Sequence, residues 1–164
     1  MPDIDFAQLS ALVVEDDRLS RELVVSILQN VGIPHVESAS DGRQAFERLH
    51  GFMADLVVSD VMMEPMDGIA FTRRLRTHRD SPNPHVPVIL LTAHTDRTTV
   101  LEARDAGVNA FVAKPVSIDE MRRKIVLVMN DPRRFIQSED YVGPDRRRRD
   151  LPLAGRRDRR KPAD

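Results

Sequence analysis

The chain of 164 residues lacks several features that define large protein classes. It has no cysteine, which excludes disulfide scaffolds, thiolate metal sites, iron–sulfur clusters and a thiol nucleophile. No apolar run approaches the ~18 residues needed to span a bilayer. The N-terminal segment MPDIDFAQLS is acidic and lacks the basic and apolar regions of a secretory signal. With 41% hydrophobic residues the chain can still bury a core, so we expect a folded cytoplasmic protein without a membrane span.

Lysine is also scarce, and the charges are unevenly distributed. Only Lys114, Lys124 and Lys161 are lysines among 25 basic residues. Residues 1–130 carry 14 basic and 19 acidic side chains, whereas residues 131–164 carry 11 and 7. An acidic body followed by a basic segment often marks an interaction tail. We therefore predict one domain over residues 8–130 and an arginine-rich C-terminal tail over 131–164, mostly without regular structure.

Apolar runs alternate with amphipathic stretches along the predicted domain. The pattern predicts strands over 11–14, 35–39, 55–60, 86–92 and 109–113, and helices over 19–31, 41–50, 69–79, 96–106 and about 118–129. Most of these strands are continuously apolar, which is typical of a parallel sheet covered on both faces. The fold class is therefore α/β, a doubly wound five-stranded parallel sheet.

Acidic residues follow two of the predicted strands. Glu15 and Asp16 come directly after the first strand, and Asp60 ends the third. Because adjacent strand ends lie roughly 5 Å apart, three carboxylates would share a small space. Such crowding raises carboxylate pKa values unless a hard cation such as Mg²⁺ lies among them. Taken singly, Asp17 and Asp60 are equally well explained as caps of helices or turns.

Two other strand ends carry groups that would complete such a site. Thr92 ends the fourth strand, although a β-branched residue is common in any strand. Lys114 directly follows the fifth strand, in a chain that otherwise uses arginine. A lysine there indicates a site that needs a compact point charge, and the alternative is an ordinary surface lysine.

Four motifs in this order resemble the receiver domain of two-component response regulators, the CheY-like family: ALVVEDD (11–17), DLVVSDVMMEPMDG (55–68), VILLTA (88–93) and FVAKP (111–115). The resemblance covers about residues 8–130 and implies the flavodoxin-like strand order 2-1-3-4-5. It further implies that Asp60 is the phospho-acceptor. Glu15, Asp16, Asp60 and the backbone carbonyl of Met62 would then be the ligands of Mg²⁺.

The resemblance also assigns a switch and partners. Thr92 matches the hydroxyl that turns toward the phosphoryl group, Lys114 the lysine that contacts a phosphoryl oxygen, and Phe111 the aromatic switch residue. Pro115 would follow Lys114 through a cis bond. The phosphoryl donor would be a sensor histidine kinase or a phosphotransfer protein. No residue stands out as a catalytic base for an outside substrate, so we expect a signalling protein and not an enzyme.

The loop after Asp60 departs from the family pattern. Receivers commonly have M-P-x-M-D-G there, whereas this chain has Met63-Glu64-Pro65-Met66-Asp67-Gly68, with proline one position late. Our hypothesis is that Glu64 makes the entrance to the site more negative and changes the rate of phosphorylation or the lifetime of the phosphate.

The tail carries a second resemblance. Tyr141 and Gly143-Pro144-Asp145-Arg146-Arg147 resemble the Cle subgroup of CheY-like regulators, which binds cyclic di-GMP through an arginine-rich extension and acts at the flagellar motor. Arginine stacks on bases and pairs with guanine or phosphate, and tyrosine adds a stacking face. The candidate ligand-binding residues are Tyr141, Asp145, Arg146, Arg147, Arg148, Arg149, Arg156 and Arg157.

Several alternatives stay open for the tail and for the domain. The tail could bind nucleic acid or another polyanion, or be a solvated basic segment without a ligand. The domain could be a ligand-binding module that needs no phosphorylation, or a Mg²⁺-dependent phosphohydrolase on the same type of fold. The 34 residues after residue 130 leave no room for a folded output domain, so we expect the output to be a contact with a downstream protein.

The last predicted helix has more apolar surface than one buried face requires. Val126, Leu127 and Met129 make its C-terminal half apolar nearly all round. We expect Phe135 and Ile136 to fold back on it, or another chain to cover it.

Overall fold

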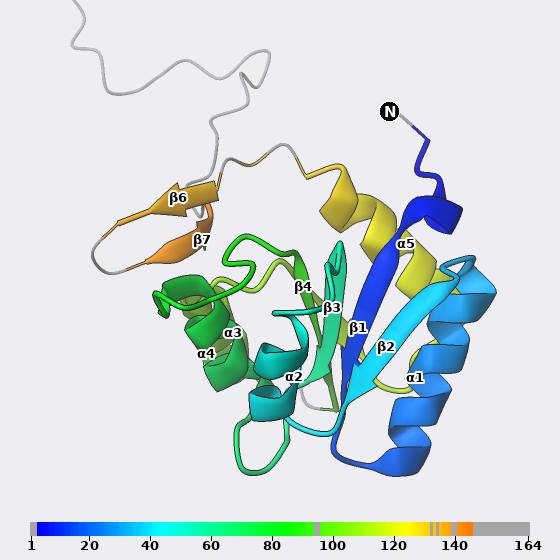
Figure 1. Ribbon diagram of the computed structural model, residues 1–164, viewed down its shortest axis with the longest axis horizontal. Coiled ribbons are helices and arrows are strands. Elements are labelled where there is room, and N and C mark those ends of the chain that lie inside the picture. The colour runs from blue at the N-terminus through cyan, green and yellow to red at the C-terminus, as the bar shows by residue number, and fades with distance from the viewer. Residues whose placement is uncertain (1–2, 94–95, 132, 134, 139–140, 146–164) are drawn as a thin grey trace, which may run out of the picture.

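A five-stranded parallel sheet in the order β2-β1-β3-β4-β5 forms the centre of the molecule (Figure 1). The computed structural model describes residues 3–93, 96–131, 133, 135–138 and 141–145. The elements of this domain are η1 Phe6–Gln8, β1 Ser10–Val14, α1 Arg18–Val31, β2 His35–Ala39, α2 Gly42–Arg48, β3 Leu56–Asp60, α3 Gly68–Thr77, β4 Val88–Thr92, α4 Arg97–Ala106, β5 Ala110–Ala113 and α5 Ile118–Met129. The predicted fold class and strand order are confirmed.

Local sequence signals fix where the helices begin and end. The residue before each of the five helices accepts a backbone N–H of the first turn with its side chain, which satisfies a donor that has no partner within the helix: Asp17, Asp41, Asp67, Asp96 and Ser117. Gly32 and Gly107 end α1 and α4 in the left-handed conformation that glycine adopts without steric cost. Asp17 is therefore a helix cap, as one of the two interpretations predicts.

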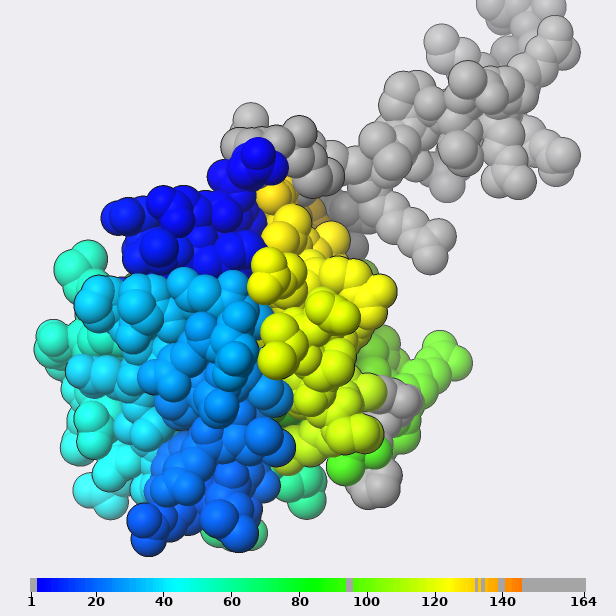
Figure 2. All heavy atoms as spheres, turned by 90° about the vertical axis from the view of Figure 1, so that its right-hand side faces the viewer, coloured from blue at the N-terminus to red at the C-terminus, as the bar shows by residue number. Residues whose placement is uncertain are grey.

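The helices cover both faces of the sheet. Helices α1 and α5 pack side by side on one face, as Figure 2 shows, and α2, α3 and α4 cover the other. Each face has its own apolar core. Leu28, Met121 and Ile125 are fully buried on the first face, and Phe71 and Leu75 on the second. Because the central strands β1, β3 and β4 are buried between two layers, their carboxyl ends form the edge where a ligand has access.

A two-stranded hairpin follows α5, which the sequence does not predict. Strands β6 (Phe135–Gln137) and β7 (Val142–Pro144) pair antiparallel. The ring of Phe135 stacks on that of His85 with centroids 4.3 Å apart, and the Arg76 guanidinium lies 4.8 Å from the Phe135 ring centre. Phe135 thus packs beside α3 and the segment before β4. The expectation that Phe135 folds back on α5 is wrong, and Leu127 remains 61% exposed.

The hairpin is packed tightly onto the domain. Tyr141 is only 5% exposed and donates a hydrogen bond to the Pro144 carbonyl at 2.7 Å. A Cβ atom on Gly107 would lie 2.4 Å from the Val142 carbonyl oxygen, and one on Gly143 would lie 2.8 Å from the Gly107 Cα. Such close approach of two backbones requires glycine on both sides. The packed unit therefore continues to about Asp145 instead of ending near residue 130.

Within the part of the chain that the structure describes, no helix is both long enough and apolar enough to cross a membrane.

Candidate functional site

Three carboxylates meet at the carboxyl edge of the sheet. Glu15 and Asp16 directly follow β1, and Asp60 is the last residue of the neighbouring strand β3. One oxygen from each of these side chains lies within 4.8 Å of the others. Glu15 and Asp60 are buried and Asp16 is exposed, so the cluster opens to solvent on one side. The predicted convergence of Glu15, Asp16 and Asp60 is confirmed.

Lys114 supplies the positive charge within this cluster. Its ammonium Nζ donates to Asp60 Oδ2 at 2.8 Å and to Glu15 Oε2 at 3.4 Å. Although burial opposes the charged form of Lys114, Asp60 and Glu15 raise its pKa above the ordinary value. Lys114 follows β5 and Asp60 ends β3. Strand β4 lies between these two strands, so the contact spans the end of β4. The alternative of an ordinary surface lysine is therefore wrong.

The pKa of Glu15 shows the effect of burying several carboxylates together. Burial raises the pKa of Glu15 to about 7, and the neighbouring Asp60 acts in the same direction. The Asp17 backbone N–H, which donates to Glu15 Oε1 at 3.2 Å, and Lys114 lower this pKa and offset part of the effect. Among the described residues, the one ammonium group of Lys114 thus contacts two of the three carboxylates, Glu15 and Asp60.

The residues present fit a bound Mg²⁺ ion. The cluster offers oxygen ligands only, as hard divalent cations require. Burial is the main cause of the raised pKa of Glu15, and a divalent charge beside the carboxylate would favour its charged form and so act against that shift. The Met62 backbone N–H donates to Asp60 Oδ1 at 3.3 Å, which places the backbone at Met62 next to the same carboxylate.

The predicted switch residues lie on the two strands beside the cluster. Thr92 ends β4 at the same edge and is 4% exposed. Phe111 lies on β5 in register with Leu90, two residues before the end of β4, and packs partly buried against the core of the α2–α4 face. The Lys114–Pro115 bond is cis, as predicted.

The loop after Asp60 forms one wall of the entrance. Glu64 lines a surface hollow of about 240 Å³ together with Asp16, Met62, Met63 and Asp67. Glu64 therefore lies at the rim where we expected it, and the Glu64–Pro65 bond is also cis. Its effect on phosphorylation stays a prediction.

Comparison with known proteins assigns this arrangement to a family. A model of the response regulator receiver domain matches residues 11–126. The chain belongs to this family. Receiver domains are signalling modules of two-component systems that accept a phosphoryl group on aspartate and bind Mg²⁺ at an acidic pocket.

Individual receiver proteins show the same similarity. The chain is 33% identical over 117 residues to the chemotaxis protein CheY of Pseudomonas aeruginosa, an alignment that covers 71% of this chain and 93% of the relative. It is 32% identical over 117 residues to CheY-3 of Vibrio cholerae, with 71% and 88% covered. The receiver resemblance predicted from the four motifs is confirmed.

Solved receiver structures have the same fold. CheY4 of Vibrio cholerae matches with a TM-score of 0.67 and 28% identity, over 73% of this chain and 98% of that one. The receiver domain of the sensor histidine kinase PA1611 from Pseudomonas aeruginosa matches with a TM-score of 0.63 and 28% identity, over 73% and 94%. In that structure a magnesium ion is coordinated in the active-site cleft.

The predicted tail residues lie mostly beyond this receiver domain. Arg146, Arg147, Arg148, Arg149, Arg156 and Arg157 lie outside the residues that the structure describes. Tyr141 and Asp145 are described, and Tyr141, which directly precedes β7, is buried. A ring that is 5% exposed has no free face for a base, so the structure contradicts the predicted stacking role of Tyr141.

Two arginines of the receiver domain were missed at the sequence level. Arg21 of α1 donates from Nη1 to the Glu15 backbone carbonyl at 2.9 Å and so helps to hold the loop that carries Glu15 and Asp16. Arg76 of α3 is 3% exposed and joins the hairpin to the domain. Arg76 directly follows the buried Leu75 and lies four residues after the buried Thr72, and this helical spacing is the signal that identifies an inward-facing position.

Proposed function

We propose that this chain is a response regulator that accepts a phosphoryl group on Asp60, with Mg²⁺ held by Glu15, Asp16, Asp60 and the Met62 carbonyl oxygen. The observation that carries the proposal is the position of the Asp60 carboxylate. It lies within 4.8 Å of two other carboxylate ligand atoms and 2.8 Å from the Lys114 ammonium. This combination serves phosphoryl transfer, which needs charge neutralisation and positioning more than acid–base groups.

The residues have distinct tasks in the transfer. An Asp60 carboxylate oxygen attacks the phosphorus of a phosphohistidine, and the P–N bond breaks with its electron pair returning to the imidazole. The imidazole then takes a proton from solvent, and Asp60 becomes an acyl phosphate. Lys114 neutralises charge that develops on a phosphoryl oxygen. Bound Mg²⁺ supplies the remaining positive charge at the phosphoryl group.

The donor protein must reach Asp60 from the exposed side of the cluster. Helix α1 begins two residues after Asp16 and exposes Leu19 and Leu23, which are 76% and 60% accessible. An apolar surface next to the acceptor fits the docking of a sensor kinase or phosphotransfer protein.

The output side lies on β4, β5 and the helices that flank them. Formation of the acyl phosphate adds negative charge between Thr92 and Lys114, which favours a hydrogen bond from the Thr92 hydroxyl. Movement of Thr92 would open space for Phe111, which is only half buried. The downstream partner would then be a protein that contacts the α4–β5–α5 surface. The flagellar motor is the target that the Cle resemblance implies.

The decisive experiment treats the full chain with acetyl phosphate and Mg²⁺ and measures a phosphoryl adduct by intact mass. We expect an adduct on the wild type and none on Asp60→Asn. Asp119→Asn, which removes an exposed carboxylate at the start of α5, serves as the matched control and should be modified like the wild type. If the wild type forms no adduct, the phosphorylation-independent module is favoured instead.

For the arginine-rich tail we propose binding of cyclic di-GMP. The support is the arginine composition, the Gly143-Pro144-Asp145-Arg146-Arg147 motif, and the hairpin, whose strand β7 ends at Pro144 directly before Asp145. Arginine pairs with guanine and with phosphate through the same planar fork. Tyr141 contributes as an anchor of the hairpin and not as a stacking face.

Calorimetric titration of the full chain with cyclic di-GMP tests this second proposal. Arg146→Ala/Arg147→Ala should weaken binding, whereas Arg122→Ala/Arg123→Ala on α5 should not. The competing function, attachment to nucleic acid, predicts instead little dependence on the base and an affinity that falls steeply with salt. Equal binding by the two variants would contradict the assignment of the ligand to the tail.

A further inference from the structure

The outer side of α3 carries an unusual concentration of positive charge. Three arginines, Arg73, Arg74 and Arg79, lie in a stretch of seven residues, in a domain that has more acidic than basic groups. We call these arginines and the neighbouring His78 the α3 basic surface. None of these three arginines forms an ion pair with a carboxylate among the residues that the structure describes. Exposed arginines are usually interspersed with acids, so a group without partners indicates a surface for an anionic ligand.

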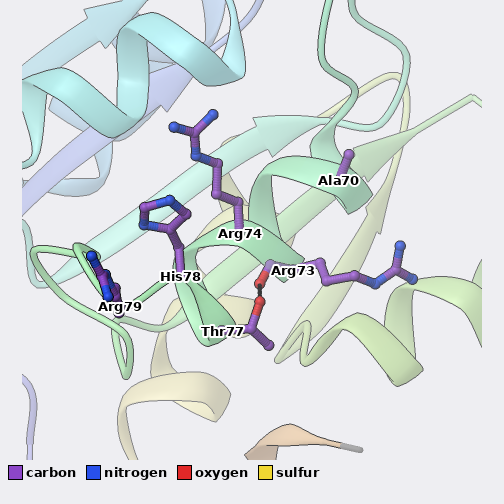
Figure 3. Close-up of a pocket in the computed structure, with 6 residues that line it drawn as sticks. All are labelled: Ala70, Arg73, Arg74, Thr77, His78 and Arg79. Atoms are coloured by element: carbon purple, nitrogen blue, oxygen red, sulfur yellow. Dashed lines mark hydrogen bonds between the residues drawn. The ribbon is translucent and has the colours of Figure 1, made fainter.

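This surface is hollowed. The α3 basic surface, Ala70 and Thr77 line an open hollow of about 670 Å³. Figure 3 shows Arg74 and His78 on one side of the helix and Arg73 reaching the other way. Positive groups that are spread in this way cannot all contact one small anion. They suit a ligand with two or more separated negative groups.

Several of these side chains are held in place before any ligand binds. The Arg74 guanidinium lies 4.5 Å from the centre of the Phe46 ring, and the His78 ring packs edge-on against Phe46 at 5.5 Å. His78 Nδ1 accepts the Asp80 backbone N–H at 3.1 Å, so the neutral ring carries its proton on Nε2. Arg74 Nε is buried and has no hydrogen-bond partner among the described residues. Buried polar atoms in folded proteins usually have such a partner, and a bound anion would favour the positive charge of this guanidinium.

We propose that the α3 basic surface binds a nucleotide ligand with at least two phosphate groups. Arginine forks match phosphate oxygens, and a flat guanidinium and an imidazole offer faces on which a base stacks. An acidic peptide would use the charges but not the flat groups that Phe46 holds in place. For this reason the geometry favours a nucleotide.

The helix that carries this surface also contacts the hairpin. Strand β7 contacts α3, and the Phe135 ring of β6 lies 4.8 Å from the Arg76 guanidinium of the same helix. The α3 basic surface therefore belongs to a helix that is held in place within the packed domain, and binding there requires no contribution from the tail.

The test uses the full chain and two probes: cyclic di-GMP, and a fluorescein-labelled oligothymidylate that presents phosphodiesters without guanine. Arg73→Gln/Arg79→Gln removes two exposed charges that have no packing role. Arg43→Gln/Arg97→Gln removes two exposed charges from α2 and α4 and is the matched control. We expect the α3 variant to weaken binding of at least one probe roughly tenfold relative to the control. For the oligonucleotide, the slope of log affinity against log salt should fall by about 1.4, as two lost phosphate contacts require.

The outcomes separate this inference from the proposed function of the tail. If Arg146→Ala/Arg147→Ala weakens cyclic di-GMP binding but the α3 variant behaves like its control with both probes, the α3 inference is overturned and the tail proposal stands. If only the oligonucleotide binds and the α3 variant weakens it, the cyclic di-GMP proposal fails and the α3 site stands. Failure of the wild type to bind either probe overturns both.

Discussion

Arg76 has a central role in the fold, although it lies outside the carboxylate cluster. Its guanidinium donates to the carbonyl oxygens of Pro84, Val86 and Gly107 and to Asn109 Oδ1. Burial lowers the pKa of Arg76 to about 10, so the group stays charged at neutral pH. It therefore satisfies backbone acceptors at the amino edge of the sheet, where β4, α4 and β5 meet.

Replacement of Arg76 should reveal this structural task. We expect Arg76→Met to lower the free energy of unfolding by about 3 kcal/mol, because several buried acceptors lose their donors. Arg76→Lys should recover only part of this loss, since one ammonium group cannot reproduce the planar fork.

Urea denaturation followed by far-UV circular dichroism measures the effect of both Arg76 variants. Arg43→Ala, at an exposed position of α2, should change stability by less than about 0.5 kcal/mol. A cost of Arg76→Met no greater than that of this control would show that water replaces the lost hydrogen bonds.

At the scale of elements, the hairpin depends on the end of α4. Gly107 has a φ of +94°, and a Cβ atom there would lie 2.4 Å from the Val142 carbonyl oxygen. Gly32 at the end of α1 has a φ of +118°, but a Cβ atom there would contact only Phe6, at 3.4 Å. The two helix ends are alike in backbone conformation and differ in what packs against them.

This difference gives a matched pair of variants. Gly32→Ala should cost about 1 kcal/mol through the left-handed conformation alone. Gly107→Ala carries the same cost and should also displace β7. The measurement is acrylamide quenching of tyrosine fluorescence, because Tyr141 is the only tyrosine and the chain has no tryptophan. Quenching should rise in Gly107→Ala and stay unchanged in Gly32→Ala; an unchanged Gly107→Ala would mean that the hairpin adapts without leaving the domain.

At the scale of the whole molecule, the two edges of the sheet differ in the charge of their side chains. The carboxyl edge holds Glu15, Asp16 and Asp60 around Lys114. The opposite edge holds Arg76, the hairpin and the last turn of α3. The two edges are separated by the length of the strands. Strands β4 and β5 connect them, because β4 ends at Thr92 on one edge and Asn109 directly precedes β5 on the other.

Much of this molecule was predictable because the signals are local. Continuous apolar runs such as 56–58 and 88–91 predict buried parallel strands, and capping residues such as Asp96 and Gly107 predict the limits of helices. The carboxylate cluster was predictable too, because residues that end parallel strands must meet at one edge. The predictions that failed concern surfaces. Phe135 packs beside α3 and not on α5, and Tyr141 is buried instead of offering a stacking face, since sequence patterns do not tell which segment covers which surface.

The sequence alone determined the strands, the helix limits, the fold class and the set of residues at the carboxyl edge, because each depends on neighbours in the chain or on the geometry of a parallel sheet. Only the tertiary structure decided where the segment after α5 lies, because its contacts join Phe135 to His85 and Gly143 to Gly107, residues that no local pattern relates. The tertiary structure also left Arg73 and Arg74 of α3 without an ion pair among the described residues, since pairing depends on which acids the fold brings within reach.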